Sequence, residues 1–262
     1  MKPTEILKVS AAPINIIPGH SEQNLAAAGD AVAALSPTSD IIVLPELFST
    51  GYTNDGDTMR SMAEPADGAT MEAVKAMACG SGCAIAGSFA AIERDGRMFN
   101  RAFFVTPDRQ AVFYDKRHLF SMSNEAAVFG SGSAHIPVIN HRGWNIAMSV
   151  CYDLRFPAWM RNRSYAYDLM LLPANWPQAR VYALEHLLIA RAIENQAPIV
   201  CANRSGSDAY GCYDDCSFAF DHMGRPAFAP GSTTASFDLN AIRLARSRFP
   251  AACDADEYAI SL

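Results

Sequence analysis

Apolar runs alternate with polar and mixed segments along the chain, and three of these runs are almost unbroken. They are residues 40–48 (DIIVLPELF), 83–91 (CAIAGSFAA) and 144–150 (WNIAMSV). An apolar run that is bounded by polar residues is typical of a strand buried on both faces, as in a parallel sheet covered by helices. The three runs therefore predict central strands of a buried sheet.

Helical patterns lie between the predicted strands. The segments that predict helices are 22–35, 70–79 and 178–195. In the last of these, apolar side chains recur with a helical period at Val181, Leu184, Leu188 and Ala192. Such spacing gives the helix one apolar face, which packs on a sheet. The alternation of strands and helices predicts an α/β protein.

The second half of the chain repeats the order of the first half. The corresponding segments are 40–48 and 168–176 (DLMLLPANW), 83–91 and 197–205, and the predicted hairpins 100–115 and 217–230. The first hairpin has its turn at Pro107 and Asp108. Asp40 and Asp168 occupy equivalent places at the start of the first pair. This order predicts two similar layers that pack sheet to sheet, with their helices outside.

Composition limits the class of protein. Half of the 262 residues are hydrophobic and 18% are charged, which is the balance of a folded globular protein. The formal net charge is −6 and the basic residues are scattered, so we expect no binding to nucleic acid. No apolar run approaches the ~20 residues that span a bilayer, and the N-terminal segment lacks the apolar stretch of a secretory signal. These features favour a cytoplasmic protein that does not enter a membrane.

The seven cysteines are an odd number in a chain without an export signal, which favours reduced thiols over disulfides. Two pairs, Cys79 with Cys83 and Cys212 with Cys216, have a C-x3-C spacing. That spacing differs from the common zinc pattern, and no histidine pair lies nearby at ligand spacing. We therefore expect neither a metal nor another cofactor.

Four polar residues stand at or just after the ends of predicted strands or hairpins: Glu46, Lys116, Cys151 and Asn175. Ligands of α/β sheets usually bind beyond the carboxyl ends of the central strands. Taken singly, each residue has a structural explanation, such as a helix cap, a solvated lysine or a small buried thiol. Their joint placement favours a shared reactive site.

A nucleophilic cysteine needs a base or a cation beside it, because only about 3% of a free thiol is ionised at pH 7. Of the six histidines, only His118 stands near such an end. Glu46 can act as the base instead if burial raises its pKa, and Lys116 can supply positive charge to a thiolate and to an oxyanion. The residues thus predict a Glu-Lys-Cys triad.

Three segments resemble the signature segments of the nitrilase superfamily, the carbon–nitrogen hydrolases. They are LPELFSTGY around Glu46, YDKRHLF around Lys116 and SVCYDLRFP around Cys151, supported by LLPANWP (171–177), RAIENQ (191–196) and NRSGSD (203–208). The resemblance extends from about residue 6 to residue 250. It implies a single domain over residues 1–262, folded as a four-layer αββα sandwich with an internal pseudo-twofold repeat, that forms homodimers through its outer helices.

The resemblance also implies roles for individual residues. Glu46 would be the general base, Lys116 the oxyanion stabiliser and Cys151 the nucleophile. Glu125 would position the substrate and the hydrolytic water, and the backbone N–H of Tyr152 would complete the oxyanion hole. A protein of this type hydrolyses an amide through a cysteinyl thioester and releases ammonia.

Within the superfamily, the segments around Lys116 and Cys151 are most similar to those of bacterial omega-amidases, which act on 2-oxoglutaramate or 2-oxosuccinamate. Arg155 could bind the distal carboxylate of such a substrate, or it could form an ion pair with Asp153 or another carboxylate. Further residues are expected to line the pocket or to belong to the core beneath it: Phe48, Phe120, Met122, Asn175 and Trp176. Other interpretations are a different small-amide hydrolase (for example a deaminated-glutathione amidase), a thiol redox protein and a non-catalytic binding protein.

The sequence departs from the family pattern at two places. Ala12-Pro13 stands where a glutamine is common near the end of the first strand, and Asp215 replaces the glycine of a Y-x-G-x-S turn. An aspartate tolerates a positive φ better than most residues do. These departures concern details of the pocket and local stability, and they leave the predicted triad unchanged.

Overall fold

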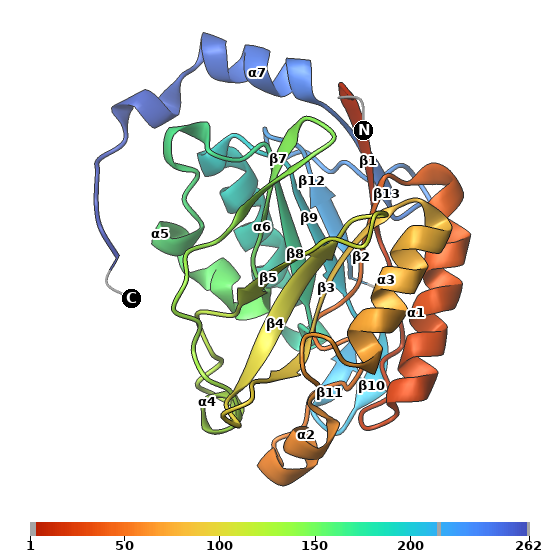
Figure 1. The fold of residues 1–262 in the computed structure, drawn as a ribbon. Coiled ribbons are helices and arrows are strands. Elements are labelled where there is room, and N and C mark those ends of the chain that lie inside the picture. The colour runs from red at the N-terminus through yellow and green to blue at the C-terminus, as the bar shows by residue number, and fades with distance from the viewer. Residues whose placement is uncertain (1–3, 214–215, 261–262) are drawn as a thin grey trace.

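A computed structural model describes residues 4–213 and 216–260 (Figure 1). Its strands are β1 (Ile6–Ala11), β2 (Ile41–Val43), β3 (Ala84–Ile92), β4 (Met98–Val105), β5 (Ala111–Asp115), β6 (Val138–His141), β7 (Trp144–Met148), β8 (Leu169–Ala174), β9 (Ile199–Asn203), β10 (Gly206–Asp208), β11 (Gly211–Tyr213), β12 (Phe218–Phe220) and β13 (Thr234–Asp238). Its α-helices are α1 (Ser21–Leu35), α2 (Gly56–Met62), α3 (Ala69–Ser81), α4 (Glu125–Val128), α5 (Pro157–Met160), α6 (Val181–Asn195) and α7 (Leu239–Arg248).

Two mixed sheets form the centre of the molecule. The first has the strand order β13-β1-β2-β3-β4-β5 and the second has the order β12-β9-β8-β7-β6, while β10 and β11 form a separate small hairpin. Strands β1, β2 and β3 are parallel, as are β7, β8 and β9, and each parallel set is flanked by antiparallel neighbours. The apolar runs of the sequence therefore form the strands buried at the centre of each sheet.

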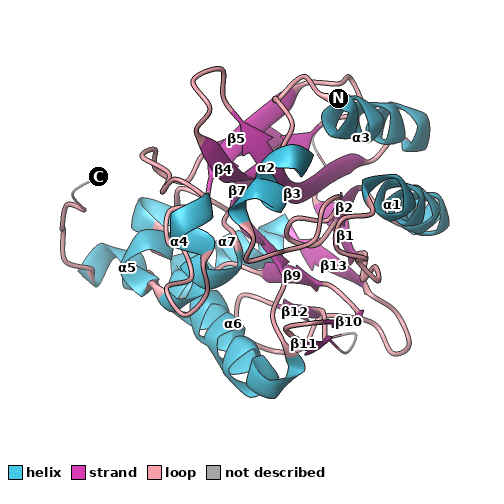
Figure 2. Cartoon of the chain, turned by 90° about the horizontal axis from the view of Figure 1, so that it is seen from below, coloured by secondary structure: helices cyan, strands magenta, loops and turns pink. Residues whose placement is uncertain are grey.

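Apolar packing arranges the sheets and helices in four layers. One continuous core joins inward-facing side chains of both sheets, including Val9 and Ile41 from the first and Ile146 and Leu171 from the second. Helices α1 and α3 cover the outer face of the first sheet, and α6 covers the outer face of the second (Figure 2). Burying each such aliphatic side chain contributes roughly 1.5–3 kcal/mol. The predicted αββα sandwich is confirmed.

The two aspartates that the sequence pairs occupy equivalent places. Asp40 precedes β2 and accepts a hydrogen bond from the backbone N–H of Lys8 at 2.9 Å. Asp168 precedes β8 and accepts one from the backbone N–H of Asn145 at 3.0 Å. Each also pairs with an arginine, Asp40 with Arg142 and Asp168 with Arg246. Each aspartate thus ties the start of its strand to the preceding strand of the same sheet.

Some predicted elements differ in extent from those of the structure. The helix expected over 178–195 begins as a 3₁₀ turn, Gln178–Arg180, and continues as α6. The hairpin 100–115 is formed by β4 and β5. In 217–230 only β12 is a strand, and its return segment meets it through an isolated bridge between Phe220 and Pro226. Proline cannot donate to a sheet ladder, which shortens the second hairpin.

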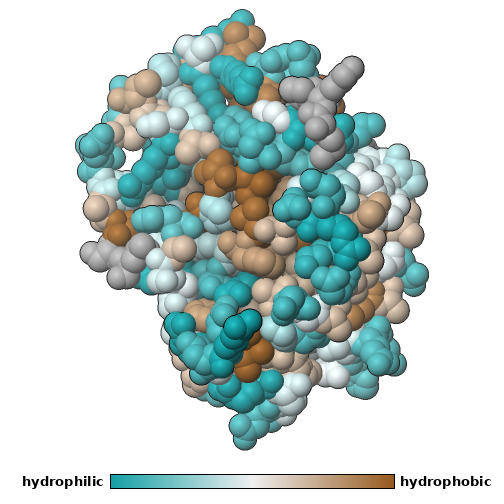
Figure 3. Space-filling model, in the orientation of Figure 1, coloured by the Kyte–Doolittle hydropathy of each residue, from teal (hydrophilic) through white to brown (hydrophobic). Residues whose placement is uncertain are grey.

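The face of the molecule that carries the β4–β5 hairpin is covered mostly by polar side chains, and apolar side chains gather near its middle (Figure 3). Among the described residues, no helix is both long enough and apolar enough to cross a membrane.

Candidate active site

The four predicted catalytic residues line one cavity of about 260 Å³. Glu46 follows β2, Lys116 follows β5, Cys151 follows β7 and Glu125 begins α4. Their exposed fractions are between 2% and 7%. The carboxyl ends of strands from both sheets therefore bring together side chains that are far apart in the sequence.

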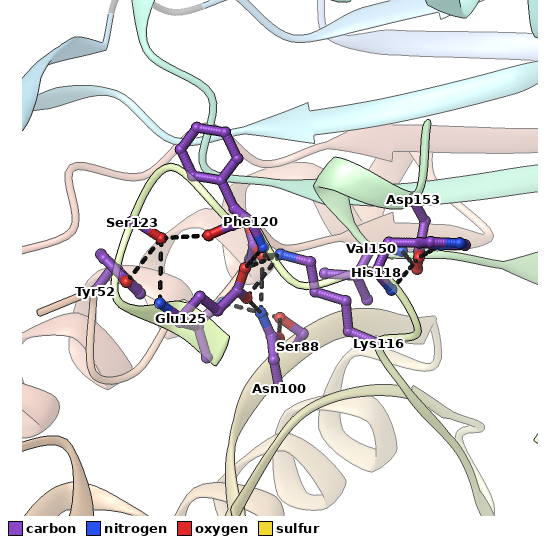
Figure 4. A network of polar contacts seen from close by, with 12 residues as sticks. Tyr52, Ser88, Asn100, Lys116, His118, Phe120, Ser123, Glu125, Val150 and Asp153 are labelled. Atoms are coloured by element: carbon purple, nitrogen blue, oxygen red, sulfur yellow. Dashed lines mark hydrogen bonds and ion pairs between the residues drawn. The ribbon is translucent and has the colours of Figure 1, made fainter. Parts of the chain in front are cut away.

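Lys116 lies between the two carboxylates. Its Nζ is 2.8 Å from Oε1 of Glu46, and 2.8 and 3.0 Å from Oε1 and Oε2 of Glu125. The backbone N–H of Phe120 also donates to Oε2 of Glu125. Figure 4 shows Lys116 reaching toward Glu125 from the end of its strand. One ammonium thus neutralises only one of two buried carboxylates.

Asn100 of β4 and Ser88 of β3 are fully buried beneath this cluster. The Asn100 amide nitrogen is 2.7 Å from Oε1 of Glu46 and 3.3 Å from Oε1 of Glu125. The Ser88 hydroxyl donates to the Asn100 amide oxygen at 2.9 Å (Figure 4). Buried carboxylates need such donors because they have lost their water.

Burial determines the protonation of the cluster. It raises the pKa of the Glu46 carboxyl, against the opposing charge of Lys116. Burial alone would lower the pKa of Lys116, but Glu125 and Glu46 raise it well above its usual value. Burial, and next the charge of Glu46, raise the pKa of the Cys151 thiol well above its usual value. The resting site therefore holds a protonated thiol beside a carboxyl that can take its proton.

Cys151 begins a 3₁₀ turn, Cys151–Arg155, and has a φ of +42°. The buried carboxylate of Asp153 holds this turn: it accepts hydrogen bonds from the Tyr114 hydroxyl at 2.8 Å, the Ser149 hydroxyl at 3.1 Å and the backbone N–H of His118 at 2.9 Å. A positive φ is costly for a residue with a side chain, so it needs such support. The turn directs the sulfur into the cavity.

His118 is not part of the reactive cluster. Its Nδ1 is 2.8 Å from Oδ1 of Asp153, and its ring stacks on Phe156 with centroids 3.7 Å apart. His118, the histidine nearest to these segments in the sequence, therefore supports the Cys151–Arg155 turn through its contacts with Asp153 and Phe156.

Two arginines line the outer part of the cavity. The guanidinium of Arg155 lies over the ring of Trp176 at 4.9 Å, and that of Arg180 lies over the ring of Phe120 at 5.0 Å. Both side chains are exposed, and within residues 4–213 and 216–260 neither forms an ion pair with a carboxylate. The Asp153 carboxylate is bound by other donors, so the ion pair considered for Arg155 and Asp153 does not form.

Asn175 lines the cavity beside the nucleophile. Its backbone N–H opposes the rise in the pKa of the Cys151 thiol. Its side-chain nitrogen and oxygen are both buried and have no hydrogen-bond partner among the described residues. Met122 and the ring of Tyr152 also line the cavity, and Met122 is 84% exposed at its rim. The cavity wall thus presents an unpaired amide donor and an unpaired amide acceptor.

Phe48 does not line this cavity, which corrects the expectation that it walls the pocket. Its side chain is fully buried in the core between the first sheet and its helices, with its ring 5.9 Å from that of Phe103.

Ala12, which stands where the family commonly has a glutamine, is also fully buried, and its backbone N–H donates to the carbonyl of Val43. Asp215 lies outside the described residues. Among those that are described, no cluster of histidine, cysteine or acidic side chains could hold a metal ion.

The sequence profile of the carbon–nitrogen hydrolase family matches residues 8–247, which is most of the chain. The chain belongs to the carbon–nitrogen hydrolase family.

Individual relatives agree with this assignment. The hydrolase is 40% identical over 225 residues to omega-amidase YafV of Escherichia coli (strain K12), covering 84% of this chain and 85% of that protein. It is 28% identical over 219 residues to 2-oxoglutaramate amidase of Bacillus subtilis (strain 168), covering 83% of each. The crystal structure of XC1258 from Xanthomonas campestris, a CN-hydrolase superfamily protein with an arsenic adduct in its active site, superposes with a TM-score of 0.92. Its sequence is 34% identical, and the match covers 98% of this chain and 100% of that one.

Sequence reasoning missed several side chains that shape the site of this hydrolase. Asn100 and Ser88 lie within strands, where a single polar residue gives no signal by itself. Only the structure shows that Asn100 is a polar residue at a fully buried strand position. Arg180 directly precedes α6. In the sequence it cannot be told apart from an ordinary exposed residue at the start of a helix. Asp153, which the sequence offers as a possible partner of Arg155, instead supports the turn that carries Cys151.

Proposed function

We propose that this hydrolase is an omega-amidase that releases ammonia from the terminal amide of small 2-oxo dicarboxylic acid monoamides. The observation that carries the proposal is the cavity itself. Its inner end holds a thiol, two carboxylates and a lysine, and its outer part holds two guanidinium groups that form no ion pair with a carboxylate of the described residues. Family membership and the similarity to YafV and to 2-oxoglutaramate amidase support the same reaction.

In the proposed mechanism, Glu46 takes the proton of the Cys151 thiol while the sulfur attacks the amide carbon. Lys116 and the backbone N–H of Tyr152 stabilise the negative charge on the amide oxygen, and one such donor contributes about 3–4 kcal/mol. The C–N bond breaks, and the proton held by Glu46 passes to the leaving nitrogen, which departs as ammonia. This leaves a thioester on Cys151.

Water then completes the turnover. Glu46 accepts a proton from a water molecule, and the resulting hydroxide attacks the thioester carbon. The C–S bond breaks, the sulfur recovers the proton from Glu46, and the product leaves as a carboxylic acid. Glu125 holds the Lys116 ammonium in place and positions the substrate and the water. The reaction needs no cofactor: the thiol proton leaves with ammonia, the water proton replaces it on Cys151, and the water oxygen and its remaining hydrogen complete the acid.

The outer cavity favours an anionic substrate. Trp176 and Phe120 hold the guanidinium groups of Arg155 and Arg180 over their faces, which orders the two cations. Because Lys116 is bound by two carboxylates, it is not available to the distal end of a substrate. The planar guanidinium suits a carboxylate better than an ammonium does. A cavity of about 260 Å³ suits a molecule the size of a four- or five-carbon diacid monoamide.

We expect Arg155→Met to lower kcat/KM for succinamate by thirtyfold to a thousandfold, since removing one partner of a charge-assisted pair costs about 2–4 kcal/mol. Hydrolysis of butyramide, which has no carboxylate, should change little. Ammonia release from both amides gives the comparison, and Arg180→Met serves as the matched variant at the second cation. Equal losses on both amides in both variants would place the carboxylate-binding group elsewhere. Release of ammonia from nitriles or N-carbamoyl compounds, but from no omega-amide, would contradict the proposed substrate class.

We also propose that the hydrolase forms homodimers through the outer face of α6. This face exposes Tyr182 at 73% and Ile193 at 51%, and Met223 near its C-terminal half is exposed at 54%. Large apolar side chains exposed along one face of a helix are typical of an interface. We expect sedimentation to give a mass near twice 28.3 kDa and expect Ile193→Asp to reduce it toward the monomer mass. A monomeric wild-type protein at micromolar concentration would contradict the proposal.

A further inference from the structure

The two carboxylates that contact Lys116 differ in how their oxygens are used. Both oxygens of Glu125 are occupied: Oε1 binds Lys116 and Asn100, and Oε2 binds Lys116 and the backbone N–H of Phe120. In Glu46, Lys116 and Asn100 bind the same oxygen, Oε1. Within the described chain, no N–H donor is bonded to Oε2 of Glu46. A carboxylate whose second oxygen is free can take a proton, while one with both oxygens bonded to donors is a poorer acceptor.

The orientation of the Asn100 amide decides this arrangement, and Ser88 fixes it. The Ser88 oxygen accepts a hydrogen bond from the backbone N–H of Leu47 at 2.9 Å, so its own hydrogen points to the Asn100 oxygen. The Asn100 nitrogen must then face the carboxylates. A flipped amide would place its oxygen against Glu46 and Glu125 and leave the Ser88 hydrogen without an acceptor. All of these side chains are buried, so water does not offer an alternative.

Ser88 also supports the backbone that carries the base. Leu47, directly after Glu46, has a φ of +49° and is buried. A leucine in this region is strained and persists only where its surroundings hold it. The hydrogen bond from its N–H to Ser88 is one such restraint. The same hydroxyl therefore holds the turn at Glu46 and the amide that binds the Glu46 side chain.

We propose that Ser88 and Asn100 are a pair of positioning residues that make Glu46, rather than Glu125, the base for the Cys151 thiol. Asn100 supplies a neutral donor to Oε1 of Glu46, which favours the ionised carboxylate and leaves Oε2 toward the thiol. The bridge from Asn100 to Glu125 holds the two carboxylates apart without adding charge. The proton transfer itself is unchanged: the S–H bond of Cys151 breaks and an O–H bond forms on Glu46. The inference rests on the proposed thiol chemistry of this site.

The ionisable groups that face Glu46 come from four elements. They are Lys116 after β5, Glu125 of α4, Cys151 after β7 and the buried thiol of Cys201 on β9. None of these groups changes in an Asn100 variant. Asn100 donates to Glu46 at 2.7 Å and to Glu125 at 3.3 Å, so loss of this donor acts chiefly on Glu46. It destabilises the ionised form of Glu46, so the pKa of this carboxyl should rise and the base should become active at higher pH.

The test compares wild type with Asn100→Leu and Ser88→Ala. The rate at which iodoacetamide alkylates Cys151 is measured across pH, with the modified residue located by mass spectrometry, and kcat/KM for succinamate is measured over the same range. We expect the acid limb of both profiles to move to higher pH by about one unit in Asn100→Leu, which is a tenfold loss at pH values below the limb. Ser88→Ala should shift the limb in the same direction by a smaller amount.

Asn162→Leu is the matched control, because Asn162 is a buried asparagine that donates to the Tyr167 carbonyl at 2.9 Å, outside the cavity. It should lower the melting temperature and leave the acid limb in place. If Asn100→Leu does not fold, Ser88→Ala decides the question. Folded variants whose acid limb coincides with that of wild type would overturn the inference, even if their rates are lower. Because alkylation needs no amide substrate, a wild type without amidase activity would contradict the proposed function and leave this test valid.

Discussion

Cys151→Ala should abolish ammonia release, with kcat falling at least about 10⁴-fold for every amide that the wild type hydrolyses. The sulfur is the only protein atom that forms a covalent bond to the substrate carbon in the proposed mechanism, and removing a nucleophile from a catalytic triad costs up to about a millionfold in rate. The fold should persist, because alanine and cysteine bear a similar cost at the φ of +42°. Ammonia release at saturating substrate and thermal unfolding are the two measurements.

Cys201→Ala is the matched control for this variant. Cys201 is a fully buried thiol on β9 that does not line the cavity. Replacing Cys201 by alanine leaves a small cavity, so it should lower the free energy of unfolding. Ammonia release should continue at a substantial rate. Mass spectrometry of the wild type during turnover should find an acyl group on Cys151. Turnover by Cys151→Ala above the level of contaminating wild type would refute the nucleophile.

Glu125→Gln should lower kcat by about a hundredfold to ten-thousandfold. Glu125 accepts hydrogen bonds from Lys116, Asn100 and the Phe120 N–H, and all of these partners are donors. A glutamine must turn its own NH₂ group toward one of them, which displaces Lys116 from the position where it stabilises the oxyanion. Loss of such a positioned group typically costs two to four orders of magnitude.

The control for this variant is Glu64→Gln. Glu64 accepts hydrogen bonds from the N–H and the hydroxyl of Thr70 at 2.8 Å, at the start of α3 and away from the cavity. The Glu64→Gln change should alter the thermal stability of the protein and leave kcat within a few-fold of wild type. A rate for Glu125→Gln as close to wild type as that of the control would reduce Glu125 to a packing residue.

The sequence predicted those parts of the molecule that depend on local pattern. The apolar runs gave the central strands, and the order of segments gave the layered fold, because burial on both faces leaves a direct mark in the sequence. Strand β13 was not predicted, although it completes the first sheet beside β1. Its pairing joins Ile6 to Asp238, and such a distant partner cannot be read from a short alternating segment.

The same distinction, between features set by local sequence and features set by tertiary contacts, applies to the residues of the candidate site. Glu46, Lys116 and Cys151 were found because each stands at an element's end within a distinctive segment. The sequence left open whether Phe48 walls the pocket or belongs to the core; the chain turns at Leu47, which has a positive φ, and the ring of Phe48 lies in the core. Asn100 became visible only when the fold brought β4 beneath the cluster. Side-chain direction at a strained turn is a tertiary property that local sequence does not encode.

The two sheets contribute different halves of the candidate site. Glu46, Lys116 and Asn100 belong to the first sheet or its connections, whereas Cys151, Asn175 and Trp176 follow strands of the second. A hydrogen bond from the Glu46 N–H to the Ala174 carbonyl, at 3.3 Å, crosses from one set to the other. Because each sheet supplies only part of the site, neither half could hydrolyse an amide alone. Activity therefore requires that the two sheets are packed together. A chain cleaved between Glu125 and β6 would be a natural test of fragment complementation, in which activity returns only when the two separately inert pieces reassemble.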